Sequence, residues 1–234
     1  MIRSSTLFFI FYFLSFIFSN NVSALRPLET DNIRVLGMEQ FAMENGYYHI
    51  DTPIIQIYQI TETFKIGIPA DLELGIEIPY TREYPWYGGE NSGVGDTTIR
   101  IKKQINDSLG YKIGCKLANG NVNRGLGSGT TDVYLLWMHD AAVGPSTVST
   151  NVGYNIIEAA PNTFRLNMAW YIPSEDIFAL VGEINAESTL KEEGWVTGLL
   201  GARAKIGFGV WDVSFRRYFE FAQNTYGLGV TLYN

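Results

Sequence analysis

The chain has 234 residues and a formal net charge of −7, from 24 acidic and 17 basic side chains. This balance excludes a cationic surface for nucleic acid or acidic lipid, because binding to phosphates requires clustered Lys and Arg. Cys115 is the single cysteine, which excludes a disulfide framework, and the length suits one domain.

The first 24 residues predict an export signal. Arg3 provides a positive start, Leu7 to Phe18 forms an apolar run without charge, and residues 22–24 read Val-Ser-Ala, as signal peptidase requires. A membrane anchor is the alternative, but this run at about 1.5 Å per residue spans ~18 Å, short of a hydrocarbon core of about 30 Å. We therefore predict a signal peptide at residues 1–24, cleaved after Ala24, and one domain at residues 25–234.

The rest of the chain is a succession of segments in which apolar residues recur at every second position, as in strands with one apolar face. From Leu72 to Ile78, for example, four aliphatic residues oppose Glu73, Gly75 and Glu77. The same alternation predicts strands at residues 99–102, 111–117, 164–172, 178–187, 196–206, 211–216 and 226–232. Less regular segments at residues 33–44, 54–67, 131–139 and 146–154 bring the expected number of strands to twelve.

The connections between these strands alternate in length. Short turns are expected at residues 69–70, 106–108, 141–145, 174–176 and 207–209. Longer polar loops are expected at residues 45–52, 83–93, 118–130, 156–163, 188–194 and 220–225. In outer-membrane barrels the short turns face the periplasm and the long loops face outside, and an even strand number returns both termini to the same side.

No apolar run of eighteen residues follows Phe18, so the mature chain offers no transmembrane helix. A closed barrel is the other structure that satisfies every backbone group in lipid. A soluble β-sandwich or lipocalin-like barrel is the alternative, but it gives no reason for connections that alternate in length or for twelve consecutive aliphatic faces. We predict an all-β fold, a transmembrane antiparallel up-and-down β-barrel of about 12 strands.

Several short motifs occur in order along the chain. They are Arg26-Pro27-Leu28 with Thr30-Asp31, Leu72 to Tyr80, Gly93 to Thr97, Gly125 to Asp132, Asn151 to Tyr154, Glu183, and Tyr226 to Gly229. In these motifs the chain resembles the outer-membrane transporter-like family named for the MetA pathway of phenol degradation. The resemblance implies a barrel associated with uptake of hydrophobic or aromatic compounds.

Charged residues of both signs fall on the faces opposite to the aliphatic ones, and we expect them to line the lumen. They are Glu73, Glu77, Arg100, Lys102, Lys112, Lys116, Arg165, Glu183, Arg203, Lys205, Asp212 and Arg216. Such charges either select solutes in an open channel or pair with one another and close a narrow lumen. The segment from Leu25 to Asn32 either plugs the lumen or stays in the periplasm.

Enzymatic and cofactor chemistry find little support. His49 and His139 are the two histidines, and neither lies in the His-x-Ser arrangement of barrel lipases, so a lipid hydrolase is disfavoured. The Gly-rich stretch from Gly120 to Gly129 lacks the Gly-Lys-Ser/Thr ending of a phosphate loop. We expect no catalytic residue, no cofactor and no metal.

These observations predict a channel in the Gram-negative outer membrane that passively takes up small hydrophobic or aromatic compounds. The alternative is a structural or surface-recognition barrel with a plugged lumen. Expected partners are outer-membrane lipid and lipopolysaccharide, the barrel-assembly machinery and a small solute, with no nucleic acid.

N-terminal sequencing of the exported protein tests the predicted cleavage. We expect the mature chain to begin at Leu25, give or take a few residues, because Ala24 is the small residue that closes the signal. A mature chain that retains the apolar run would contradict this prediction.

Overall fold

The computed structural model describes residues 28–86, 88–174, 177–189, 194–207, 209–220 and 223–233, so the predicted signal peptide lies outside the described residues. Its strands form one antiparallel sheet. They are β1 (Phe41–Asp51), β2 (Ile55–Ile68), β3 (Leu72–Pro85), β4 (Asn91–Val94), β5 (Thr98–Gln104), β6 (Leu109–Lys116), β7 (Asp132–Val143), β8 (Ser146–Ile156), β9 (Thr163–Ser174), β10 (Phe178–Thr189), β11 (Trp195–Ile206), β12 (Gly209–Tyr218) and β13 (Gln223–Tyr233).

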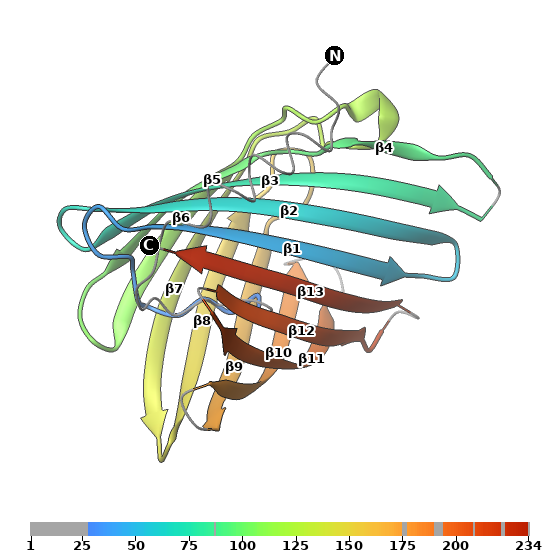
Figure 1. The fold of residues 1–234 in the computed structure, drawn as a ribbon. Coiled ribbons are helices and arrows are strands. Elements are labelled where there is room, and N and C mark those ends of the chain that lie inside the picture. The colour runs from blue at the N-terminus through green and yellow to red at the C-terminus, as the bar shows by residue number, and fades with distance from the viewer. Residues whose placement is uncertain are drawn as a thin grey trace.

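The sheet closes on itself as an up-and-down barrel (Figure 1). The first and last strands, β1 and β13, pair antiparallel from Ala42 opposite Tyr233 to Asp51 opposite Asn224. The short β4 and the following β5 lie along the same edge of β3, so together they act as one interrupted strand. The wall therefore has twelve strands, which confirms the predicted fold class.

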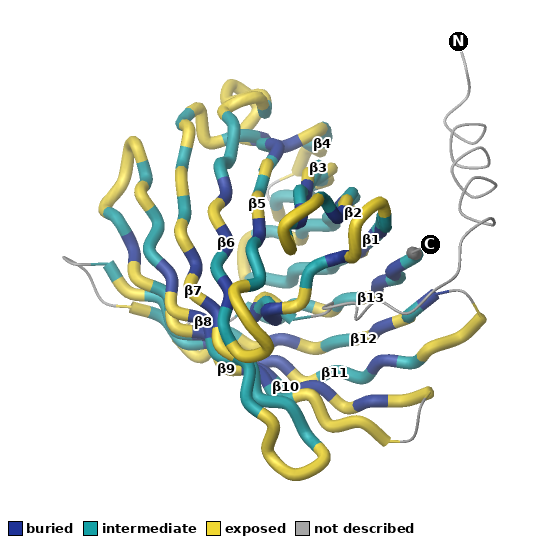
Figure 2. Tube along the Cα trace, turned by 90° about the vertical axis from the view of Figure 1, so that its left-hand side faces the viewer, coloured by how far each residue is buried: buried dark blue, intermediate teal, exposed yellow. Residues whose placement is uncertain are grey.

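Burial alternates along the strands, as Figure 2 shows for β7 to β11. In β10, Ala179, Val181 and Glu183 are buried inside the barrel. Leu180 and Ile184, at alternate positions of the same strand, lie on the outer face and are 50% and 46% exposed. Period-two alternation in the sequence thus becomes an aliphatic outer wall and a polar inner wall. Among the described residues, no helix is long and apolar enough to cross a membrane.

The connections sort into two ends of the barrel, which we call the short-turn end and the long-loop end. Short turns follow β2 at residues 69–71 and β5 at residues 105–108, close to the predicted positions. The turn after β7 is tighter than expected, at residues 144–145, with Gly144 at a φ of 59° that favours glycine. Long loops follow β6 at residues 117–131 and β8 at residues 157–162.

The first expected strand is wrong. The structure begins β1 at Phe41 rather than at residue 33, so the expected outer loop at residues 45–52 lies almost wholly inside β1. Polar and apolar residues are mixed on both faces of this strand, with Glu44 inward and Asn45 outward, which weakens the period-two pattern. Residues 28–40 instead leave the wall and lie in the lumen.

A carboxylate ties the longest described loop to the wall at the long-loop end. Asp96, between β4 and β5, accepts hydrogen bonds from the backbone of Gly120 at 2.8 Å and Ser128 at 2.7 Å, and from the Ser128 hydroxyl at 2.8 Å. Burial acts to raise the pKa of Asp96, but these hydrogen bonds outweigh it and hold the pKa below its usual value. Two motifs that the sequence separates, Gly93 to Thr97 and Gly125 to Asp132, therefore meet at one clasp.

We expect Asp96→Asn to loosen the loop at residues 117–131. The amide NH2 of the new side chain would face N–H and O–H donors of the loop, and hydrogen bonds to a charged carboxylate, each of which contributes about 1.5–3 kcal/mol, would be lost. Amide hydrogen exchange at Gly120 and Ser128 should rise, whereas Asp107→Asn in an exposed turn should leave it unchanged.

The same clasp should respond to acid. Because the folded pKa is lowered, the carboxylate stabilises the loop above the unfolded pKa of about 3.9, and this contribution is lost as the pH falls through the folded value. Equal amide hydrogen exchange at Gly120 and Ser128 in Asp96→Asn and Asp107→Asn at neutral pH would contradict the clasp.

Candidate functional site

The lumen holds a piece of the chain itself, residues 28–40, which we call the luminal segment. It enters at the short-turn end, where β1 begins, and runs without regular structure into the barrel. At this same end it crosses β2 so closely that a Cβ on Gly67 would lie 1.9 Å from the carbonyl oxygen of Gly37. The wall therefore leaves room for this segment by omitting a side chain.

Two apolar side chains anchor the luminal segment. Ile33 is 2% exposed and packs against Leu136 and Met138 on β7. Leu36, also 2% exposed, packs with Ala42 at the start of β1. Full burial of such side chains contributes about 1.5–3 kcal/mol each, so these contacts hold the segment against an otherwise polar wall.

Wall side chains also satisfy the irregular backbone of the segment. The backbone N–H of Thr30 and its hydroxyl both donate to Glu183, the hydroxyl at 2.6 Å. Asp31 and Asn151 are joined reciprocally: the Asp31 N–H donates to the Asn151 side chain at 2.6 Å, and the Asn151 amide donates back to the Asp31 carbonyl at 2.8 Å. A non-helical chain inside a barrel is tolerated because protein groups replace the missing ladder.

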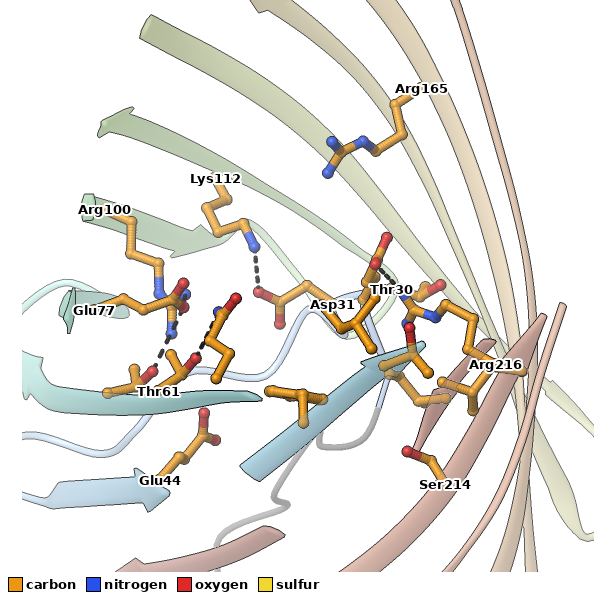
Figure 3. A pocket seen from close by; sticks show the side chains of 18 of the residues that line it. Thr30, Asp31, Glu44, Thr61, Glu77, Arg100, Lys112, Arg165, Ser214 and Arg216 are labelled. Atoms are coloured by element: carbon orange, nitrogen blue, oxygen red, sulfur yellow. Dashed lines mark hydrogen bonds and ion pairs between the residues drawn. The ribbon is translucent and has the colours of Figure 1, made fainter. Parts of the chain in front are cut away.

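The carboxylate of Asp31 lies between two lysines of the wall, of which Figure 3 shows Lys112. It contacts Lys102 Nζ on β5 at 3.0 Å and Lys112 Nζ on β6 at 2.8 Å. The two lysines are direct cross-strand partners, an arrangement in which like charges repel. Asp31 thus neutralises a repulsion that the wall itself contains.

Arg216 on β12 forms a second bridge between wall and segment. Its guanidinium contacts Glu183 on β10 at 3.2 Å and also pairs with Glu29 of the luminal segment. Glu183 therefore serves Thr30 and Arg216 together. Glu183 and Arg216 are thus satisfied in part by the segment, as Lys102 and Lys112 are.

Other charges pair within the wall. The pairs are Glu44 with Lys65 at 2.6 Å, Glu77 with Arg100 at 3.2 Å, Arg165 with Glu187 at 2.9 Å, and Lys116 with Asp132. Each joins neighbouring strands, so the pairs hold side chains against the wall rather than across the lumen. Space consequently remains beside the luminal segment.

A cavity of about 380 Å³ occupies this space. Residues 28–31 of the luminal segment line one side of it, and Glu77, Arg100, Lys112, Arg165 and Arg216 are among its wall residues. Tyr48, Ile50, Leu199 and Tyr218 add apolar surface. The volume is within the range of about 300–1,000 Å³ typical of small-molecule sites.

The twelve charged residues predicted to line the lumen all fall on the inner parity of their strands. Seven are buried, namely Glu73, Lys102, Lys112, Glu183, Arg203, Asp212 and Arg216. Glu77, Arg100, Lys116 and Arg165 are half-buried, and Lys205 is exposed at the short-turn end. Whether they line a path for a solute stays a prediction.

The sequence reasoning missed Asp31, Glu44 and Lys65. Asp31 lies outside any strand, so no periodicity marks it. Lys65 follows Thr61 and Thr63 on the inner face of β2, but Glu62 on the outer face, beside Asn45, blurred the alternation. The cross-strand register, which sequence alone does not provide, is what identifies these residues.

No protein-family model and no curated protein matches the chain. Among solved structures, an outer membrane channel from Pseudomonas putida F1 matches with a TM-score of 0.74 at 12% identity, over 92% of this chain and 100% of that one. The NanC porin matches with 0.58 at 9% identity, over 81% and 98%. The KdgM porin in complex with disordered oligogalacturonate matches with 0.57 at 9% identity, over 82% and 98%.

At these identities the likeness establishes the fold, that of outer-membrane barrels. The resemblance to the phenol-degradation family stays an expectation, because no family model supports it.

We expect Ile33→Ala to release the luminal segment, because truncating this buried side chain costs about 2–5 kcal/mol. Arg34, the next residue, offers a trypsin site that the docked segment cannot present in the extended form a protease needs. Trypsin should cleave the folded variant after Arg34 at least about tenfold faster than the unaltered protein, since about 1.4 kcal/mol corresponds to a factor of ten.

Met38→Ala is the matched control, because Met38 is 65% exposed in the same segment. It should leave the cleavage rate unchanged within about twofold, as surface substitutions typically alter stability by less than about 0.5 kcal/mol. Equal rates for Ile33→Ala and Met38→Ala would contradict the anchoring role.

Proposed function

We propose that the protein is an outer-membrane channel that takes up small hydrophobic or aromatic solutes passively, with the luminal segment as its closure. The observation that carries this proposal is the way the lumen is filled. Four pairs of wall charges join neighbouring strands, and the obstruction is a segment ahead of β1 that enters from one end and becomes N-terminal on the predicted cleavage after Ala24. Such a segment is able to leave without disturbing the barrel ladder.

The cavity beside the segment supports a small solute. Its lining combines charged groups with Tyr48, Tyr218, Ile50 and Leu199, so it offers apolar surface to an aromatic body. The fold shared with an outer membrane channel and with porins favours the same class of function. Fold alone does not determine a solute, so the lining carries this part of the proposal.

A permanently plugged structural barrel is the second candidate. The buried anchors Ile33 and Leu36 and the ion pairs of Asp31 favour it, because they hold the segment firmly. The two candidates differ in one measurable property. A channel conducts once the segment is removed, and a structural plug leaves a barrel too narrow or too unstable to conduct.

The test is planar-bilayer conductance of a variant that lacks residues 28–36. This deletion keeps residues 25–27 after the predicted cleavage site and leaves β1 intact. We expect stable open steps from the deletion, brief openings from Ile33→Ala, and closed behaviour from Met38→Ala and the unaltered protein. Heat-modifiable migration on a detergent gel checks that each barrel is folded.

Proteoliposomes containing the deletion variant should also admit phenol faster than those containing the unaltered protein. A folded deletion variant with no conductance and no added permeability would overturn the channel and favour the structural barrel.

A further inference from the structure

The wall contains a binding arrangement for a carboxylate. Lys102 and Lys112 are opposed across β5 and β6, both point into the lumen, and both are buried at 2% and 8% exposed. Two buried ammonium groups at adjacent cross-strand positions require an anion between them. The anion present is the Asp31 carboxylate. Its Oδ1 contacts Lys102 and its Oδ2 contacts Lys112.

The second contact of the luminal segment with a wall cation has the same chemistry. Glu29 pairs with Arg216, which lines the same cavity as Lys112 from another strand. The segment thus presents two carboxylates to the cations of the cavity wall. Guanidinium and ammonium groups bind free carboxylates through the same charge-assisted hydrogen bonds.

The cavity next to these cations matches a carboxylate that carries an apolar body. Five cations line it, Lys65, Arg100, Lys112, Arg165 and Arg216, against the four carboxylates of Glu29, Asp31, Glu44 and Glu77. Glu44 and Glu77 already pair with Lys65 and Arg100 on the wall. The two remaining carboxylates belong to the luminal segment. When the segment leaves, Arg165 and Arg216 keep Glu187 and Glu183, whereas Lys102 and Lys112 lose the carboxylate that bridges them.

We propose that Lys102 and Lys112 bind the carboxylate of a small aromatic or aliphatic monocarboxylic acid, and that the luminal segment occupies this site as an internal mimic of the solute. This inference rests on the proposed channel function and names its substrate class. The acid group replaces the Asp31 carboxylate, and Tyr48, Tyr218, Ile50 and Leu199 contact the apolar body. Binding of the solute then favours release of the segment, because the carboxylate of the solute and the carboxylate of Asp31 compete for the same two lysines.

The coupling predicts that a carboxylate solute loosens the segment in the full-length protein. Benzoate is the probe, and benzyl alcohol is the matched uncharged control with the same ring. Benzoate should accelerate trypsin cleavage after Arg34 by at least about tenfold at saturation, because it displaces the Asp31 carboxylate from both buried lysines, whereas benzyl alcohol should have no effect. Asp31→Asn should lower the benzoate concentration that gives half of the effect, because it weakens the internal competitor.

Variants of the wall identify the site. Lys112→Gln should abolish the benzoate effect, because it removes one of the two groups that hold the carboxylate. Lys103→Gln is the control: this lysine follows Lys102 on β5 but has the opposite parity and contacts the turn at Ala70. In the variant lacking residues 28–36, calorimetric binding of benzoate should be retained and should weaken at least about tenfold on Lys112→Gln, since buried charge pairs contribute several kcal/mol.

Failure of this inference differs from failure of the channel. If the deletion variant conducts but benzoate and benzyl alcohol act alike, or Lys112→Gln binds benzoate as well as Lys103→Gln does, the carboxylate site is wrong and the channel stands. If benzoate binds at the lysines but the folded deletion variant does not conduct, the site stands as a binding site and the channel is overturned.

Discussion

The pairing of β1 with β13 is the constraint on which the rest of the structure depends. A sheet in hydrocarbon has no water to satisfy an open edge, so its first and last strands must meet. The continuous register from Ala42 to Asp51 against Tyr233 to Asn224 removes that edge. Once the wall is closed, outward positions face an apolar medium and inward positions face a narrow enclosed space, and the alternation of side chains follows from this.

Closure creates a second requirement inside the barrel. Charges that face a narrow lumen lose much of their hydration and need partners. Some partners lie on the neighbouring strand, as Glu77 does for Arg100. Lys102 and Lys112 oppose each other instead, and their partner arrives from the luminal segment. The segment is therefore held by the electrostatics of the wall as well as by the burial of Ile33 and Leu36.

The sequence predicts the wall far better than its contents. In residues 178–187 the alternation is clean, because one face meets an apolar medium and the other a polar interior. It fails at residues 41–51, where Glu44 faces inward and Asn45 outward, so the strand was expected eight residues too early. Asp31 gives no periodic signal at all, because an irregular segment has no repeating face. Its role depends on Lys102 and Lys112, which lie 71 and 81 positions further along the chain. The two lysines come together only because β5 and β6 are neighbours in the sheet.

The position of the luminal segment ahead of β1 has a consequence for the order of folding. Its contacts span most of the sequence, with Thr30 bonded to Glu183 across 153 positions. Those partners exist only after β10 has joined the wall, and contacts of such separation form late because their loop-closure entropy must first be overcome. The segment enters from the end where β1 begins, so with the predicted cleavage after Ala24 it threads into a finished barrel without crossing the bilayer. Assembly should accordingly pass through a closed, empty barrel that is briefly permeable before the segment docks.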